Sequence, residues 1–317
     1  MKCVYQDKVQ IQKAQSGFTL IELMISLVLG LLIIGAVAQI YITMVRTELV
    51  QRGAGEISDV SIFGIQSVEQ KLRIANLGNP ENNINQTTVG GGVVLAQENI
   101  GGTGTDTKLF THSPTSKSGG DGVSGTDKPS DTLTIQYTNV TGLPMIDCES
   151  NTVAVNERVI ERYFLRTSTD RTATGLVLAC DAGRLNDTGI VTGTGAEGTK
   201  AFGGNGSDMV LNVEQFNVLL GVQNLNGQMA YIKPTDYLAT TNTTFNKAPI
   251  VAIRFGMLVR SDKPVVATEI PNNPMSILGE ANQPSTVGNY IRKVYESTSM
   301  LRNARVITVT VDNATQL

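Results

Sequence analysis

An isolated carboxylate, Glu22, lies near the start of a long apolar segment. It is the one charged side chain between Phe18 and Val45. As a helix this segment would be about 42 Å long, more than the ~30 Å hydrocarbon core of a membrane requires. A carboxylate at mid-bilayer costs about 2.5–3.5 kcal/mol on insertion scales. We therefore expect a membrane-spanning helix in which Glu22 has a charged partner.

The residues around Glu22 form a recognisable motif. Gly17-Phe18-Thr19-Leu20-Ile21-Glu22, followed by the apolar run, resembles the processing signature of type IV prepilins. The resemblance implies that a prepilin peptidase of the inner membrane cleaves after Gly17 and methylates Phe18 as the new amino terminus. It also implies that Glu22 is used in filament assembly.

The spacing between Phe18 and Glu22 supports this interpretation physically. After cleavage at Gly17, the new ammonium would lie four residues before Glu22, one helical turn and about 6 Å along the axis. The carboxylate could pair with its own terminus or with that of a neighbouring subunit. The second pairing would set axial register, because a low dielectric penalises unpaired charges. A simpler alternative is that Glu22 lies near the lipid headgroups and extends toward them.

An ordinary signal peptide is a second interpretation of the amino terminus. Leu23–Gly35 could be its apolar core, and Ala36-Val37-Ala38 fits a small-residue cleavage site that would release a protein beginning at Gln39. Apolar residues continue beyond that site, which argues against it.

Charge around the apolar segment predicts its orientation. The leader holds Lys2, Lys8 and Lys13 against Asp7, whereas mixed charges follow Val45. Positive charge keeps a flank in the cytoplasm, so we expect the remainder to be exported to the periplasm. The net charge of −3 and pI of about 5.4 do not favour nonspecific nucleic-acid binding.

Two cysteines could form a disulfide. Cys3 lies in the leader, which leaves Cys148 and Cys180 in a compartment that permits oxidation. Their bridge would close a loop of about 33 residues and stabilise the fold by roughly 3.5–4 kcal/mol. Two unpaired thiols are the alternative. With one histidine, His112, we predict no metal site and no cofactor.

Helical periodicity continues beyond the apolar segment. Apolar residues recur at three- and four-residue steps, at Ile57, Val60, Ile62, Ile65, Val68, Leu72 and Leu77. Gly53, Gly55 and Gly64 weaken this stretch by up to about 1 kcal/mol each and predict a kink near 53–55. Leu77-Gly78-Asn79-Pro80 predicts the helix end. A helix from Phe18 to about Leu77 would be roughly 90 Å long.

The rest of the chain has the pattern of a loop-rich antiparallel β domain. Residues 79–130 are rich in Gly, Asn, Thr, Ser and Asp, which predicts long loops with a short strand at Val93–Leu95. Asp121, Asp127 and Asp131 match no calcium-loop spacing and are interpreted as loop solvation. Strands are predicted at 133–137, 153–155, 159–165, 176–180, 209–213, 216–222, 251–259, 265–270 and 305–311. Residues 289–301 fit either a helix or a strand, and 187–207 is predicted as a second glycine-rich loop.

Three segments of the head resemble the PilW-type minor pilins and the related J-type minor pseudopilins of type II secretion. They are Val213–Gly221, Ile250–Ser261 and Leu301–Asn303. The resemblance implies an α+β, pilin-like fold: a leader (1–17), a helix (18–77, with 18–45 in the membrane or filament core and 46–77 on the head) and a periplasmic head (78–317). It implies a low-copy subunit at the pilus tip that primes assembly and contacts other minor pilins, the major pilin and a PilY-type adhesin.

Other classes fit less well. Gly193–Gly198 formally matches a dinucleotide fingerprint, but no helix-forming sequence follows it. A hydrolase relay would depend on His112 alone. We therefore predict that the chain is not an enzyme. A minor pseudopilin of a secretion system, and a secreted or membrane-anchored binding protein, remain as alternatives.

Overall fold

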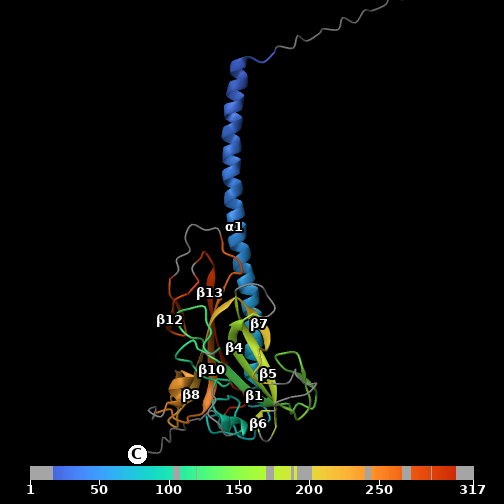
Figure 1. Ribbon diagram of the computed structural model, residues 1–317, viewed down its shortest axis with the longest axis vertical. Coiled ribbons are helices and arrows are strands. Elements are labelled where there is room, and N and C mark those ends of the chain that lie inside the picture. The colour runs from blue at the N-terminus through green and yellow to red at the C-terminus, as the bar shows by residue number, and fades with distance from the viewer. Residues whose placement is uncertain are drawn as a thin grey trace, which may run out of the picture. The chain divides into compact units, whose positions relative to one another are not determined.

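The computed structural model describes residues 17–102, 108–118, 120–168, 175–186, 189–190, 202–239, 244–265, 273–286 and 288–304, without the side chains of residues 60, 61, 189 and 190. The chain divides into two units, one ending at Leu49 and one beginning at Val50. Helix α1 (Leu20–Ile74) contributes residues to both (Figure 1).

Helix α1 is one unbroken helix of 55 residues. The glycines that predicted a kink do not interrupt it, and two of them lie on its buried face. A Cβ atom on Gly64 would lie 2.2 Å from Cγ2 of Val210, and one on Gly53 would lie 3.4 Å from Cδ1 of Ile291. Gly64 therefore lets the helix backbone lie close to β7, and Gly53 lets it lie close to the residue that precedes β13.

Asn76 terminates the packed part of α1, slightly earlier than predicted. It adopts a left-handed conformation, with φ of 65°, just after Ile74. Its buried side chain donates to the carbonyls of Glu81 and Asn303, both at 2.9 Å, and accepts the N–H of Gly92 at 2.9 Å. The helix end is thus fixed by bonds to segments before and after the β-sheets.

Two antiparallel sheets make up most of the second unit (Figure 1). The first has the order β1 (Leu133–Thr138), β4 (Arg158–Thr167), β5 (Leu176–Asn186) and β6 (Gly189–Ile190), and β7 (Ser207–Leu211) also pairs with β5. The second has the order β13 (Arg292–Met300), β10 (Ile250–Arg260), β8 (Val213–Gln223) and β9 (Met229–Ile232). The predicted α+β class is confirmed.

Small elements complete the described fold. β2 (Met145–Ile146) pairs with β3 (Thr152–Val153), and β11 (Met275–Ile277) pairs with β12 (Glu280–Asn282). A 3-10 turn, η1 (Gln97–Ile100), and a short helix, α2 (Pro234–Leu238), lie in the connections. Neither of these was predicted from the sequence.

One apolar core joins both sheets to residues 57–72 of α1. Ile57, Val68 and Leu72 of the helix belong to the same buried cluster as Leu133 of β1 and Phe255 of β10. The helix side chains recur every three or four residues, so one face is covered. Burial of this face holds residues 57–72 of α1 on the second unit.

Most predicted strands agree with the structure to within a few residues, and five segments need separate comment. Val93–Leu95 makes a single bridge, Val93 to Ile135, instead of a strand. The ambiguous segment 289–301 contains β13, because pairing with β10 along its whole length favours the extended form. Gly189–Ile190, in a predicted loop, pairs with β5. Of the strand predicted at 265–270, Val265 is described and lies outside any strand, and residues 266–270 lie outside the described residues, as does the strand predicted at 305–311.

Candidate functional site: an exposed apolar helix and a cross-linked head

Thr19 caps the amino end of α1. Its Oγ1 accepts the N–H of Glu22 at 3.3 Å, and its carbonyl accepts the N–H of Leu23 at 3.2 Å. Glu22 is therefore in the first turn, where the helix dipole favours a carboxylate. The sequence signal for this arrangement, a threonine three residues before a glutamate, is the capping-box pattern. The capping role of Thr19 beside Glu22 was not predicted from the sequence.

The first unit exposes a nearly continuous apolar surface. From Phe18 to Leu49 its side chains are exposed, with Phe18 at 84% and Leu20 at 79%. The helix is long and apolar enough to cross a membrane. The hydroxyls of Ser26 and Thr43 donate to helix carbonyls at 2.9 Å, as hydroxyls in lipid must. This surface needs a cover of lipid or of other helices.

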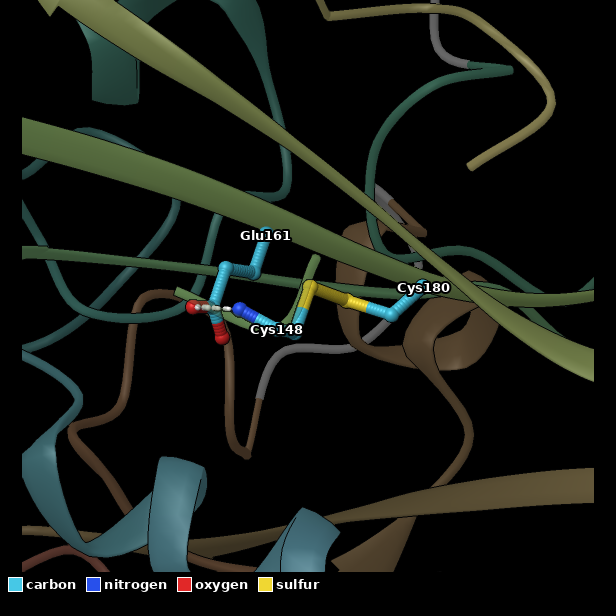
Figure 2. A group of neighbouring side chains, drawn as sticks. All are labelled: Cys148, Glu161 and Cys180. Atoms are coloured by element: carbon cyan, nitrogen blue, oxygen red, sulfur yellow. Dashed lines mark hydrogen bonds between the residues drawn. A yellow bond between two sulfur atoms is a disulfide. The ribbon is translucent and has the colours of Figure 1, made fainter. Parts of the chain in front are cut away.

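A disulfide joins the β2–β3 connection to the first sheet. Cys148, in the connection between β2 and β3, is bonded to Cys180 on β5, with their Cα atoms 6.1 Å apart. Figure 2 shows Glu161 beside the bridge, where it accepts the N–H of Cys148 at 3.0 Å. The three side chains lie within 4.8 Å of one another, but both sulfurs are committed to the S–S bond. This cluster is therefore a structural cross-link instead of a thiolate metal site.

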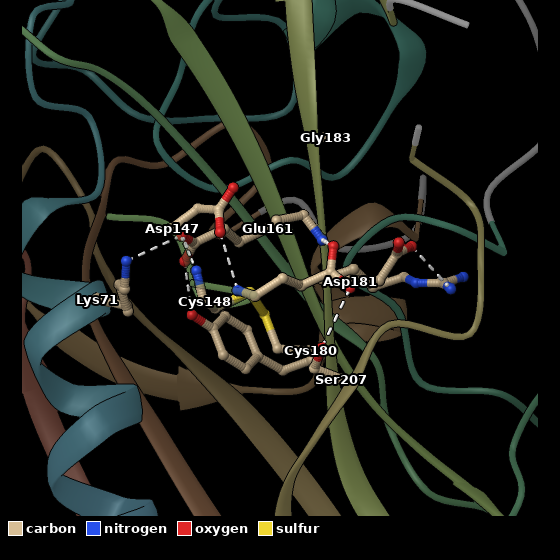
Figure 3. The surroundings of a disulfide bond; sticks show 12 residues. Lys71, Asp147, Cys148, Glu161, Cys180, Asp181, Gly183 and Ser207 are labelled. Atoms are coloured by element: carbon tan, nitrogen blue, oxygen red, sulfur yellow. Dashed lines mark hydrogen bonds and ion pairs between the residues drawn. A yellow bond between two sulfur atoms is a disulfide. The ribbon is translucent and has the colours of Figure 1, made fainter. Parts of the chain in front are cut away.

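Glu161 connects the disulfide to helix α1 (Figure 3). Its fully buried carboxylate pairs with Lys71 at 3.1 Å and accepts the hydroxyls of Tyr137 at 2.9 Å and Tyr163 at 2.7 Å. Burial, and then the charge of Glu161, raise the pKa of both tyrosines, so they remain protonated donors. One carboxylate thus ties α1, β1, β4 and the Cys148 loop together.

Buried ion pairs lie on both faces of the first sheet. Arg162 of β4 pairs with Asp181 of β5 at 3.1 Å on the face opposite Glu161, and Arg184 of β5 pairs with Asp147 at 2.9 Å on the same face as Glu161. All four side chains are at least nine-tenths buried. Both faces are covered, which explains why β4 and β5 are buried almost throughout instead of alternating. Sequence patterns alone did not reveal these pairs.

The interpretation of three aspartates as loop solvation is wrong for Asp131. Its carboxylate is buried and accepts the N–H of Val218 at 2.7 Å. Asp121 accepts a bond from His112, and Asp127 accepts the N–H of Gln283. Each aspartate therefore fixes a loop to a neighbouring segment.

Comparisons with known proteins agree with this architecture. Residues 12–38 match the prokaryotic N-terminal methylation motif, and residues 162–303 match PilW, the family of type IV pilus-assembly protein W. A type IV-like pilin from Thermus thermophilus is 12% identical and has a TM-score of 0.39, with 79% of this chain and 100% of that chain covered. That TM-score supports no argument about individual residues. No curated protein matches the chain.

The matches and the fold define the class of the protein: it is a type IV pilin-like chain that carries a prepilin motif. Within that class, its residues 162–303 are similar to the PilW family of pilus-assembly proteins. The predicted resemblance is thereby confirmed, and membership implies interaction with other pilus components. Gly17, Phe18 and Glu22 lie inside the matched motif. Their roles in cleavage, methylation and assembly remain predictions, and Gly193–Gly198 lies outside the described residues.

Proposed function

We propose that this chain is a minor pilin that is inserted in the bacterial inner membrane and then incorporated at the tip of a type IV pilus. It is cut after Gly17 by prepilin peptidase and methylated at Phe18. At the tip it primes assembly and supports a PilY-type adhesin. The observation that carries the proposal is the exposed apolar surface of α1, which has one carboxylate, Glu22, in its first turn.

The apolar surface explains transfer from membrane to filament. A helix exposed along its whole circumference is stable in lipid or among similar helices, but not in water. Glu22 supports docking in one register, because its carboxylate can pair with the ammonium of a subunit that is already in place. Packing of helices, instead of covalent chemistry, is therefore the proposed mode of action.

The cross-linked head suits a role in contacts with other subunits. The Lys71–Glu161 pair attaches the first sheet to α1, and the disulfide holds the β2–β3 connection on that sheet. A force on the head is therefore transmitted to the helix. We propose that the head contacts other minor pilins and the major pilin. A minor pseudopilin of a type II secretion system would use the same amino-terminal physics and is the second candidate.

Replacement of Glu22 by alanine tests the proposal in cells. Glu22→Ala should leave membrane insertion unchanged and reduce recovery of the chain in sheared pili at least tenfold. Glu48→Ala, which removes an exposed acid farther along the same helix, is the matched control and should assemble normally. Normal assembly of Glu22→Ala would contradict the proposal and favour a membrane-anchored binding protein. Recovery with secretion pseudopilins instead of pili would favour the second candidate.

A further inference from the structure

The free edge of β8 is covered by a loop instead of a strand. β9 pairs with β8 only from Leu220 onward, so the earlier residues of β8 have β10 on one side alone. Residues 120–131, which we call the strap, lie along the other side. The N–H of Gly125 bonds to the carbonyl of Glu214 at 2.6 Å, and the N–H of Asp131 bonds to the carbonyl of Phe216 at 2.8 Å.

Side chains of the strap complete this edge. Ser130 Oγ accepts the N–H of Phe216 at 3.2 Å, and Asp131 Oδ2 accepts the N–H of Val218 at 2.7 Å. Four backbone groups of β8 therefore depend on the strap for their hydrogen bonds. β1 begins at Leu133, two residues after Asp131, so the strap also connects the two sheets.

His112 fastens the start of the strap in a way that requires two protons on its ring. Nδ1 lies 2.8 Å from the carbonyl oxygen of Phe110, and Nε2 lies 2.9 Å from Oδ2 of Asp121. A carbonyl and a carboxylate only accept hydrogen bonds, so both ring nitrogens must donate. A neutral ring would leave one of these two acceptors facing a lone pair. The backbone of His112 also bridges Thr132, next to the other end of the strap.

Asp131 fastens the other end. As the last residue of the strap it is buried, and it lines two cavities of about 240 and 320 Å³, which give water a route to its carboxylate. Lys233 and Glu280 face it with opposite charges. Burial raises its pKa to about 7. Burial by itself lowers the pKa of His112, but the bonds to Asp121 and Phe110 and the charges of Asp121 and Asp131 outweigh it and raise that pKa.

We propose that the strap is a pH-sensitive closure of the β8 edge, held closed at mildly acidic pH and loosened above neutral pH. Two titrations act in the same direction. When His112 loses a proton, its bond to Phe110 or to Asp121 is lost. When Asp131 ionises, a buried charge draws water into the cavities beside it. Both changes loosen the strap and weaken its bonds to Glu214 and Phe216, whereas the N–H of Val218 bonds more strongly to an ionised Asp131. The inference is independent of where the chain lies in a filament.

Hydrogen exchange on the full chain in detergent tests the proposal. After correction for intrinsic exchange, the protection of the amides of Gly125, Asp131 and Phe216, which bond across the edge between the strap and β8, should fall at least tenfold from pH 5.5 to pH 8.0. Asp131→Asn keeps an acceptor for Val218 and should retain most of the protection at pH 8.0. The double variant His112→Gln, Asp131→Asn should vary less than threefold over this range. Asp236→Asn, an exposed acid lining the larger cavity, should behave as the wild type.

Two results would overturn the proposal. One is constant protection in the wild type between pH 5.5 and pH 8.0, and the other is a wild-type fall in the double variant. Because His112 is the one histidine in the chain, its imidazole gives a single NMR signal that needs no substitution. A titration midpoint above the usual 6.5 supports the doubly donating ring. A midpoint at or below that value contradicts it.

Discussion

Lys71 of helix α1 and Glu161 of strand β4 form an ion pair of 3.1 Å, in which the glutamate side chain is fully buried and the lysine side chain 16% exposed. The same lysine donates to the carbonyl of Ile146, two residues before the disulfide-bonded Cys148. The head is therefore attached to its helix by a charge as well as by apolar packing.

Removal of this lysine should be costly. Lys71→Met keeps the aliphatic length but leaves Glu161 buried without a cation, which typically costs about 3–5 kcal/mol. Arg73→Met is the control, since Arg73 is 49% exposed in its pair with Glu69 and should change stability by less than about 1 kcal/mol. Denaturant unfolding of the two variants measures the difference. Equal effects would show that the buried pair does not anchor the helix.

Two helix glycines should respond oppositely to alanine. Gly64→Ala places a Cβ atom 2.2 Å from Val210 and should destabilise the head by about 1–3 kcal/mol. At Gly55 nothing lies within 4 Å of the new atom, so Gly55→Ala should stabilise by roughly 0.5–1 kcal/mol. Thermal unfolding of each variant tests this pair. A stabilising Gly64→Ala would contradict the close packing of α1 on β7.

Loss of the disulfide should destabilise the segment that contains β2 and β3, between β1 and β4 in the chain. Cys148→Ser with Cys180→Ser removes a bridge between positions separated by 32 residues, which should cost roughly 3–4 kcal/mol. The backbone N–H of Cys148 also donates to Glu161, and the disulfide holds it there. Amides of residues 145–153 should therefore exchange faster than those of the second sheet in the variant. Uniform loss of protection over both sheets would contradict this local effect.

Stability should decline from mildly acidic to alkaline pH. Folding raises the pKa of His112 and of Asp131, so the folded state holds protons more tightly than the unfolded chain. The resulting stability is present at low pH and is lost as pH rises through about 7. Burial raises the pKa of Glu149 and Asp181 as well, which adds to the same trend. Calorimetry should give a lower melting temperature at pH 8.0 than at pH 5.5, and a higher one at pH 8.0 would contradict this assignment.

Features with a local sequence pattern were predicted well. The long helix follows from apolar periodicity, and β1, β4, β8 and β10 follow from alternation or apolar runs between turn residues. The position of Glu22 also follows from its neighbours in sequence. Thr19 could have been found in the same way, because its spacing to Glu22 is a known capping signal.

Features that depend on distant residues were not predictable. Glu161 looks like a surface residue of a strand until Lys71, Tyr137 and Tyr163 are brought around it. Asp131 lies in a polar sequence that predicts solvent exposure, yet it completes the edge of β8. Gly64 predicted weakness in a helix, whereas its role is close approach to Val210. In each case tertiary contacts decide the role, and one sequence contains no record of them.

The most direct test of the central claim is the amino-terminal residue of the mature chain. Mass spectrometry of protein purified from cells with active prepilin peptidase should find N-methylated Phe18 as the first residue, with residues 1–17 removed. A chain that begins at Gln39 would show ordinary secretion, and one that retains residues 1–17 would show no processing. Either result would contradict the account of α1 as a pilin assembly helix.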